Sequence, residues 1–255
     1  MGILTWAYRI YGRMQRRAEF ECLCRRHGLA LNWRRDGDAG DILTDIFQQR
    51  VYADYFPFQE AAVVLDIGAH RGYFLLFCAR QLDAQAKLFA VEPHPQNFAD
   101  LQQVLREHNI PSVQALQAGV SDCSASATLH QSRSPNHSLF AGHAAALGQS
   151  QWGSCSVETL TLEVLLDRLQ LTQVDFLKMD AEGAEYPALL SADAATLRRC
   201  KVISLEFHDV KTKGCTGLAL VRHLEACGFR IVKFAHGSTV IDNNYGYLVG
   251  VRADD

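Results

Sequence analysis

The feature that most constrains the fold is an alternation of two kinds of segment that begins at residue 63. Runs rich in β-branched residues at positions 63–67, 88–92 and 112–116 start about 25 residues apart. The segment over residues 73–81 is apolar nearly all round, which predicts a buried helix. Short strands that alternate with helices are typical of parallel βαβ units. The sequence therefore predicts an α/β fold with a mostly parallel sheet and helices on both faces.

The second half of the chain continues this pattern and then departs from it. Strands are predicted over residues 174–179 and 202–207, and a helix with Thr216 as its N-cap follows the second. Residues 229–234 and 245–251 then form two strand-like runs with no helix between them, joined by a polar stretch that contains the run DNN. This arrangement predicts a hairpin, so a parallel sheet would end in an antiparallel strand.

Residues 122–172 resist the alternation, because about fifty residues are too many for one structureless loop in a compact domain. We expect a strand near residues 125–130 and a helix that begins at Thr161. The remainder, residues 132–154, is rich in Ser, Gly, Ala and His and lacks a period. This segment is a candidate lid over a substrate site, and an ordinary mobile loop is the alternative.

Charge is unevenly distributed along the chain. Residues 1–35 contain eight arginines against two glutamates, a net +6, whereas residues 36–255 contain 17 basic and 26 acidic side chains, a net −9. Helical spacing of apolar residues and arginines predicts one or two basic amphipathic helices in the first 27 residues. Such a helix packs on its own domain or lies on an anionic membrane surface, with Trp6 and Tyr8 at the headgroup level. Nucleic acid is disfavoured as a partner because the rest of the chain is acidic.

Composition and cysteine spacing complete the outline. Apolar residues make up 48% of the 255 residues and charged residues 21%, which excludes a disordered chain. The eight cysteines include no CxxC pair, and neither a membrane-spanning stretch nor a secretory leader is predicted, so we expect reduced thiols and a cytoplasmic protein. We divide the chain into a basic helical segment, residues 1–45, and an α/β domain, residues 46–255.

The end of the first predicted strand provides candidate cofactor-binding residues, because ligands of open α/β sheets bind beyond the carboxyl ends of the strands. The run DIGAHRG contains four of them: Asp66, Gly68, His70 and Gly72. Glycines let the backbone turn sharply beside a ligand, and the helix start favours a carboxylate or a phosphate. Tight packing of the helix against the strand is the structural alternative.

Glu92 ends the second predicted strand, 26 residues after Asp66. An acid at this place can accept hydrogen bonds from both hydroxyl groups of a ribose. The alternative is an exposed acid that caps the next helix. The glycine turn upstream favours the ribose.

Two further strand ends provide candidate catalytic residues. Asp180 and Glu182 follow the strand over residues 174–179, and His208 closes the run ISLEFH. Carboxylates there could orient a nucleophile, accept its proton or bind a hard cation, and the histidine is chemically suited to be a general base. Structural ion pairing with Lys178, and a merely hydrogen-bonded histidine, are the alternatives.

Together with Glu206, these acids predict an acidic crevice, which repels a pyrophosphate and attracts a cation. S-adenosylmethionine carries a sulfonium and an ammonium, so electrostatics favour it over NAD. A nucleotide-cofactor oxidoreductase would need the third glycine of the dinucleotide fingerprint, which this chain lacks. A non-catalytic Rossmann-like subunit that docks partners is the alternative of another class.

Four runs occur in the order VVLDIGAHRGYF, AVEPHPQNF, VDFLKMDAEGAEYPAL and ISLEFH. Over roughly residues 50–250 the chain thereby resembles the FkbM family of S-adenosylmethionine-dependent methyltransferases. The resemblance implies a Rossmann-like class I methyltransferase fold, with a seven-stranded, mostly parallel sheet and an antiparallel C-terminal hairpin. It also implies that Asp66, Gly68 and Glu92 hold the cofactor and that Asp180 faces the methyl group.

The resemblance further implies O-methylation, because members mostly methylate hydroxyl groups of sugars, glycans or natural products. The fold would hold the acceptor oxygen behind the methyl carbon, and Asp180, Glu182 or His208 would take the hydroxyl proton. A divalent ion on Asp180 and Glu182 is chemically compatible but not required, so no metal site is predicted. His70 stands where the family usually has asparagine, and the basic N-terminal helix lies outside the family pattern.

Overall fold

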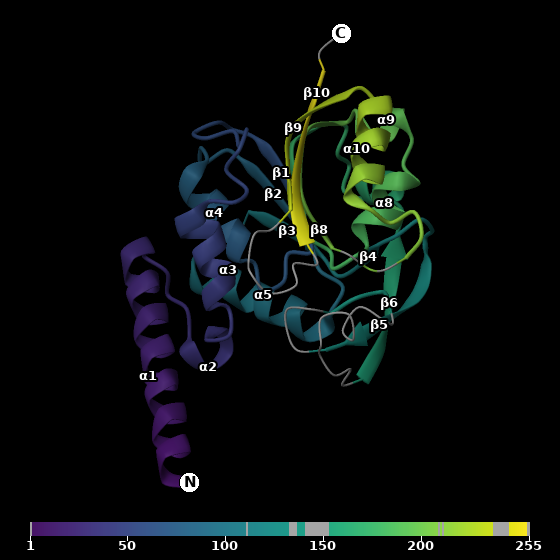
Figure 1. Ribbon diagram of the computed structural model, residues 1–255. Coiled ribbons are helices and arrows are strands. Elements are labelled where there is room, and N and C mark those ends of the chain that lie inside the picture. Colours follow the sequence, from purple (N-terminus) through teal and green to yellow (C-terminus); the bar gives the residue numbers. More distant parts are fainter. Residues whose placement is uncertain are drawn as a thin grey trace.

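The computed structural model in Figure 1 describes residues 2–110, 112–132, 137–140, 153–208, 210, 212–236 and 245–253, with the backbone alone for residues 2–10 and 236. Its centre is a seven-stranded sheet with the order β3-β2-β1-β7-β8-β10-β9. The strands are β1 Val63–Ile67, β2 Lys87–Val91, β3 Val113–Leu116, β7 Val174–Met179, β8 Cys200–His208, β9 Phe229–His236 and β10 Tyr245–Arg252. The predicted α/β class and mostly parallel sheet are confirmed.

The C-terminal strands pair in the predicted antiparallel manner. β10 pairs with β9 on one side and with β8 on the other, and Tyr247 lies opposite Glu206. β10 is therefore inserted between β8 and β9, so the last strand of the chain is internal to the sheet. The predicted DNN turn lies outside the described residues.

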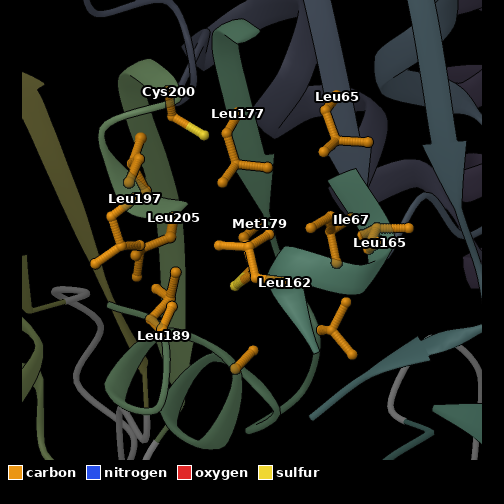
Figure 2. Packing of buried hydrophobic residues seen from close by; sticks show 14 of the residues in the cluster. Leu65, Ile67, Leu162, Leu165, Leu177, Met179, Leu189, Leu197, Cys200 and Leu205 are labelled. Atoms are coloured by element: carbon orange, nitrogen blue, oxygen red, sulfur yellow. The ribbon is translucent and has the colours of Figure 1, made fainter. Parts of the chain in front are cut away.

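Helices cover both faces of the sheet, as Figure 1 shows. One face carries α4 Tyr73–Gln81 and α5 Pro95–Glu107, and the other carries α7 Leu162–Arg168, α8 Glu185–Leu190, α9 Ala194–Leu197 and α10 Gly217–Ala226. Successive residues of a strand point to opposite faces. Accordingly Leu65 and Ile67 of β1 pack in the core under α7 and α8, shown in Figure 2, whereas Val64 packs under α4.

A smaller sheet interrupts the alternation between β3 and β7. It has the order β4-β6-β5 and consists of β4 Gly119–Val120, β5 Ala125–Gln131 and β6 Gly153–Leu160. β5 confirms the strand predicted near residues 125–130, and Thr161 caps α7 as predicted by accepting from the N–H of Val164. The predicted C-terminal boundary of the candidate lid over residues 132–154 was wrong, because its last two residues belong to β6. Residues 133–136 and 141–152 lie outside the described residues.

The N-terminal segment folds against the α4 face. It contains α1 Gly2–His27, α2 Trp33–Asp36, α3 Gly40–Thr44 and the π-helix η1 Asp45–Gln49, which follows α3 directly. Residues 2–27 thus form one helix. Asp36 is fully buried and accepts from the hydroxyl of Tyr73 at 2.9 Å, while Phe20 and Leu43 join the same core as α4.

Two further observations concern the thiols and the helices. All eight cysteines lie within the described part of the chain and are free, as expected for reduced thiols. Among the helices that the structure describes, none combines the length and the apolar character that crossing a membrane requires.

Candidate active site

A cavity of about 520 Å³ opens where β1, β2, β7 and β8 end. Parallel strands place their carboxyl ends at one edge of the sheet, so polar residues from distant parts of the sequence meet there. The residues predicted from strand ends that line the cavity are Gly68, His70, Glu92, Asp180, Glu182, Glu206 and His208.

Asp66 and Gly72 are the two predicted cofactor residues that do not line the cavity. Asp66 is fully buried in β1, where its Oδ1 lies 3.0 Å from Nζ of Lys178. Lys178 also donates to the carbonyl oxygen of Gly68 at 3.0 Å. Gly72 is the left-handed residue before α4, and a Cβ there would meet the side chain of Leu101. Both residues therefore support the turn from outside the cavity lining.

Gly68 brings the end of β1 close to the end of β7. Its φ is +75°, and a Cβ at this position would lie 1.7 Å from the carbonyl oxygen of Asp180. Any side chain would push the β1 turn away from the residues that follow β7. The glycine is required by close approach of two backbones, a reason that the sequence pattern alone does not distinguish from contact with a ligand.

Glu92 is a preorganised carboxylate on the cavity wall. Its two oxygens accept from the backbone N–H groups of His70 at 2.8 Å and His94 at 2.9 Å. Burial raises the pKa of Glu92 to about 7, although these hydrogen bonds oppose the shift. Asn97 also lines the cavity, with its amide nitrogen 3.5 Å from Glu92. Sequence reasoning missed Asn97, although its place in the first turn of α5 after Glu92 was a usable signal.

His208 stands at the centre of the predicted catalytic group. Its Nε2 lies 3.5 Å from Glu206, 3.6 Å from Glu182 and 3.9 Å from Asp180. The side chain is buried, so these carboxylates interact with the imidazole in a poorly solvated setting. The structure thus brings the three predicted catalytic residues together around one ring nitrogen.

Glu185 completes the group, and sequence reasoning did not select it. Its Oε1 lies 3.2 Å from Nδ1 of His208, and its two oxygens accept from the N–H groups of Ala181 and Gly183 at 2.7 Å each. Glu185 is fully buried at the start of α8. A third carboxylate in the run DAEGAE was visible in the sequence, but the turn that aims it at His208 was not.

These contacts decide the charge of His208. Burial lowers the pKa of His208, but Glu182 and the hydrogen bonds with Glu185 and Glu206 raise it more, so the pKa lies well above the usual value. The neighbouring carboxylates thus favour the charged imidazolium, which has no lone pair with which to accept a proton. The geometry therefore favours a carboxylate over His208 as the general base.

Asp180 has the properties of such a base. Its side chain is 30% exposed, and burial together with the neighbouring Glu206 raises its pKa to about 8. The hydroxyl of Tyr52 lies 3.3 Å from an oxygen of each of these two acids and can donate to one at a time. A base is most effective when its pKa is close to the working pH. Tyr52 belongs to no motif and could not have been selected from the sequence.

Asp180, Glu182 and His208 are also the one group among the described residues with potential metal-ligand atoms all within 4.8 Å of one another. Carboxylate oxygens and an imidazole nitrogen suit a divalent cation. A metal would need the Nε2 lone pair that the proton occupies in charged His208. Metal and proton would therefore compete for this position.

The N-terminal segment supplies the opposite wall of the cavity. Asp38, Asp41 and Asp45 line it from the start of α3 and from η1, and Asp38 pairs with Arg71 at 2.7 Å. Burial raises the pKa of Asp45 to about 6, and the nearby carboxylate of Glu206 adds to the shift. The sequence predicts only a basic helical segment over residues 1–45, and the fold returns these three acids to the sheet edge.

Comparison with known proteins identifies the domain. The profile of the Methyltransferase FkbM domain matches residues 66–231. Methyltransferase 1 of Beauveria bassiana is 28% identical over 205 residues, which are 74% of this chain and 80% of the fungal protein. The AMB antimetabolite synthetase AmbE of Pseudomonas aeruginosa is 30% identical over 213 residues, which are 70% of this chain but only 10% of that protein.

Solved structures agree on the fold. An rRNA methylase from Streptococcus thermophilus superimposes with a TM-score of 0.51 at 12% sequence identity, covering 80% of this chain and 93% of the methylase. The sheet order and the antiparallel C-terminal pair described above are those of a class I methyltransferase fold. None of these matches favours an oxidoreductase. With two thirds of its length matching the domain profile, the chain belongs to the FkbM family of methyltransferases.

Proposed function

We propose that this protein is an S-adenosylmethionine-dependent O-methyltransferase whose acceptor is a hydroxyl group of a sugar, a glycan or a natural product. The observation that carries the proposal is that one cavity contains both the preorganised carboxylate of Glu92 and the carboxylate group around His208. The first suits a nucleoside, and the second suits removal of a proton from a hydroxyl.

The residues of the cavity fit this cofactor. Glu92 presents a carboxylate whose orientation is fixed by two N–H groups, as recognition of ribose hydroxyls requires. The apolar side chains of Val120 and Leu129 also line the cavity and suit a purine ring. Seven acidic residues line the cavity and complement a sulfonium and an ammonium. Bound S-adenosylmethionine supplies an electrophilic methyl group.

The catalytic work of the chain is to hold the acceptor and to take its proton. Asp180 accepts the hydroxyl proton as the oxygen becomes bonded to carbon, a contribution on the order of 10²–10⁴ in rate. Charged His208 keeps Glu182 and Glu206 in place beside Asp180. Tyr52 donates a hydrogen bond to Asp180 or to Glu206 and so restricts the position of either carboxylate.

The test is transfer of a labelled methyl group from S-adenosylmethionine to a cell extract, followed by treatment of the product with alkali. A methyl ether survives alkali, whereas a methyl ester loses its label. We expect an alkali-stable product with the natural protein and its loss with Asp180→Asn. Calorimetric titration with S-adenosylmethionine checks that the variant still binds the cofactor. Label that is lost in alkali, or an equally active Asp180→Asn variant, would contradict the proposal.

A further inference from the structure

Helix α1 packs on the domain through one face of its C-terminal half. Phe20, Leu23 and Cys24 are at most 6% exposed, and their spacing of three and four residues places them on one side of the helix. Phe20 packs edge-on against Trp33 of α2, with 5.4 Å between the ring centroids. In Figure 1 the N-terminal end of the helix extends away from the central sheet.

The apolar residues of the other half of α1 lie on a different side. Tyr11 is 65% exposed and Met14 is 66% exposed. An α-helix turns by about 100° per residue, so Tyr11 and Met14 lie about 180° and 120° around the axis from Phe20. In the sequence, Leu4 and Ala7 stand seven residues before Tyr11 and Met14 and continue the same stripe. Tyr11 and Met14 therefore lie away from the buried side chains that dock the helix on the domain, and in the sequence the apolar spacing extends to residues 4 and 7.

The side of the helix opposite this stripe is strongly positive. Residues 1–18 contain four arginines and no acid, namely Arg9, Arg13, Arg16 and Arg17. Arg13, Arg16 and Arg17 are exposed. Of these three arginines, Arg17 is the one with an ion pair to another described residue, Glu21 at 2.7 Å. The remainder of the chain is acidic. An anionic surface is thus attracted by the helix and repelled by the domain.

We propose that the N-terminal half of α1 binds the surface of an anionic lipid bilayer. The apolar stripe would enter the boundary between headgroups and acyl chains, and the arginines would contact lipid phosphates. A second copy of the chain complements the charge less well than an anionic surface, because this segment of each copy contains four arginines and no acid. A nucleic acid would leave the apolar stripe without a partner. The proposal does not depend on the methyl acceptor or on the cofactor.

The experiment is co-sedimentation of the full chain with vesicles of phosphatidylcholine alone or with phosphatidylglycerol added. We expect binding to the anionic vesicles only, weakened by salt. Arg13→Gln combined with Arg16→Gln should weaken it by about tenfold or more, and Tyr11→Ser combined with Met14→Ser should also weaken it. Matched controls are Arg106→Gln combined with Lys87→Gln, and Leu218→Ser, which alter exposed residues elsewhere.

The outcomes separate the proposal from its rivals. The altered side chains are exposed, so all variants should unfold at the same temperature as the natural protein. Equal loss of binding in the helix variants and their controls would overturn the proposal. So would equal binding to neutral and anionic vesicles. A dimer in light scattering that Met14→Ser dissociates would assign the stripe to a second copy of the chain instead.

Discussion

Glu185 holds His208 from the side opposite the cavity, with 3.2 Å between Oε1 and Nδ1. The same carboxylate is fixed by two backbone N–H groups in the turn before α8, so its orientation does not depend on the histidine. The ring is thereby aligned with Nε2 toward Asp180, Glu182 and Glu206. We propose that Glu185 is a positioning residue, which would act on the reaction through His208.

Glu185→Gln should therefore lower the pKa of His208 and reduce turnover. The amide removes one of the negative charges that stabilise the imidazolium, while its oxygen can still accept one hydrogen bond. An NMR titration of the imidazole checks the pKa. Glu185→Asp serves as the conservative comparison, since it keeps the charge. An unchanged imidazole titration in Glu185→Gln would contradict the positioning role.

Asp180→Asn should reduce kcat on the order of 10²–10⁴-fold and leave cofactor affinity nearly unchanged. Because the pKa of Asp180 is about 8 and a base acts in its deprotonated form, the rate of the natural enzyme should rise with pH up to a plateau above pH 8. Tyr52→Phe removes a hydrogen-bond donor to the carboxylate and should move this rise to higher pH. A flat profile between pH 6 and 9, or a profile that Tyr52→Phe leaves in place, would assign the base elsewhere.

Glu92→Gln should weaken S-adenosylmethionine binding and alter the pH dependence of stability. The pKa of Glu92 is about 7 in the fold against a usual 4.5, so its contribution to stability is fully present below pH 4.5 and is lost as pH rises toward 7. The glutamine variant does not ionise, so relative to the natural protein it should gain stability over this range. Chemical denaturation at several pH values measures the effect. A stability difference that is the same at pH 4 and pH 8 would contradict the assignment.

Removal of metal ions should leave turnover unchanged, because the imidazolium of His208 already places a positive charge among the carboxylates that a cation would hold. The measurement is the initial rate after dialysis against a chelator, with a mock-dialysed sample as the control. A loss of activity that Mg²⁺ or Mn²⁺ restores would instead place a cation among Asp180, Glu182 and His208.

The enzyme should prefer neutral or cationic acceptors over anionic ones. Seven acids line the cavity, and Lys178, the only lysine or arginine among its described lining residues, is paired with Asp66. A phosphate or carboxylate on the acceptor would meet an excess of like charge, which lowers kcat/KM by about tenfold or more. Rates with a neutral sugar and with its phosphate ester test this. A preference for the ester would contradict it.

Much of the fold could be predicted because its signals are local. The helix over residues 73–81 and the strands over residues 63–67 and 174–179 have the bounds that the sequence pattern predicts. In each of them, a mostly apolar run marks the element, and flanking polar or glycine residues mark where it ends. β6, the central strand of the smaller sheet, was missed, because its partner β5 lies more than twenty residues earlier and no local signal links the two.

The candidate site was predictable to the extent that it sits at strand ends. Topology requires that residues after β1, β2, β7 and β8 meet at one edge, and strand ends are readable from sequence. Whether a given side chain faces the cavity is a different question. Asp66 and Glu92 both occupy strand ends, yet Asp66 is buried against Lys178 while Glu92 lines the cavity.

The sequence by itself determined the order of most elements, the edge of the sheet at which the candidate site lies and the family. Only the tertiary structure decided that Tyr52 reaches Asp180, that Glu185 aligns His208, and that acids from the N-terminal segment form the opposite wall. Tyr52 and Asp180 are 128 residues apart in the chain. Contacts of this kind depend on how whole elements pack, and no local periodicity or spacing encodes them.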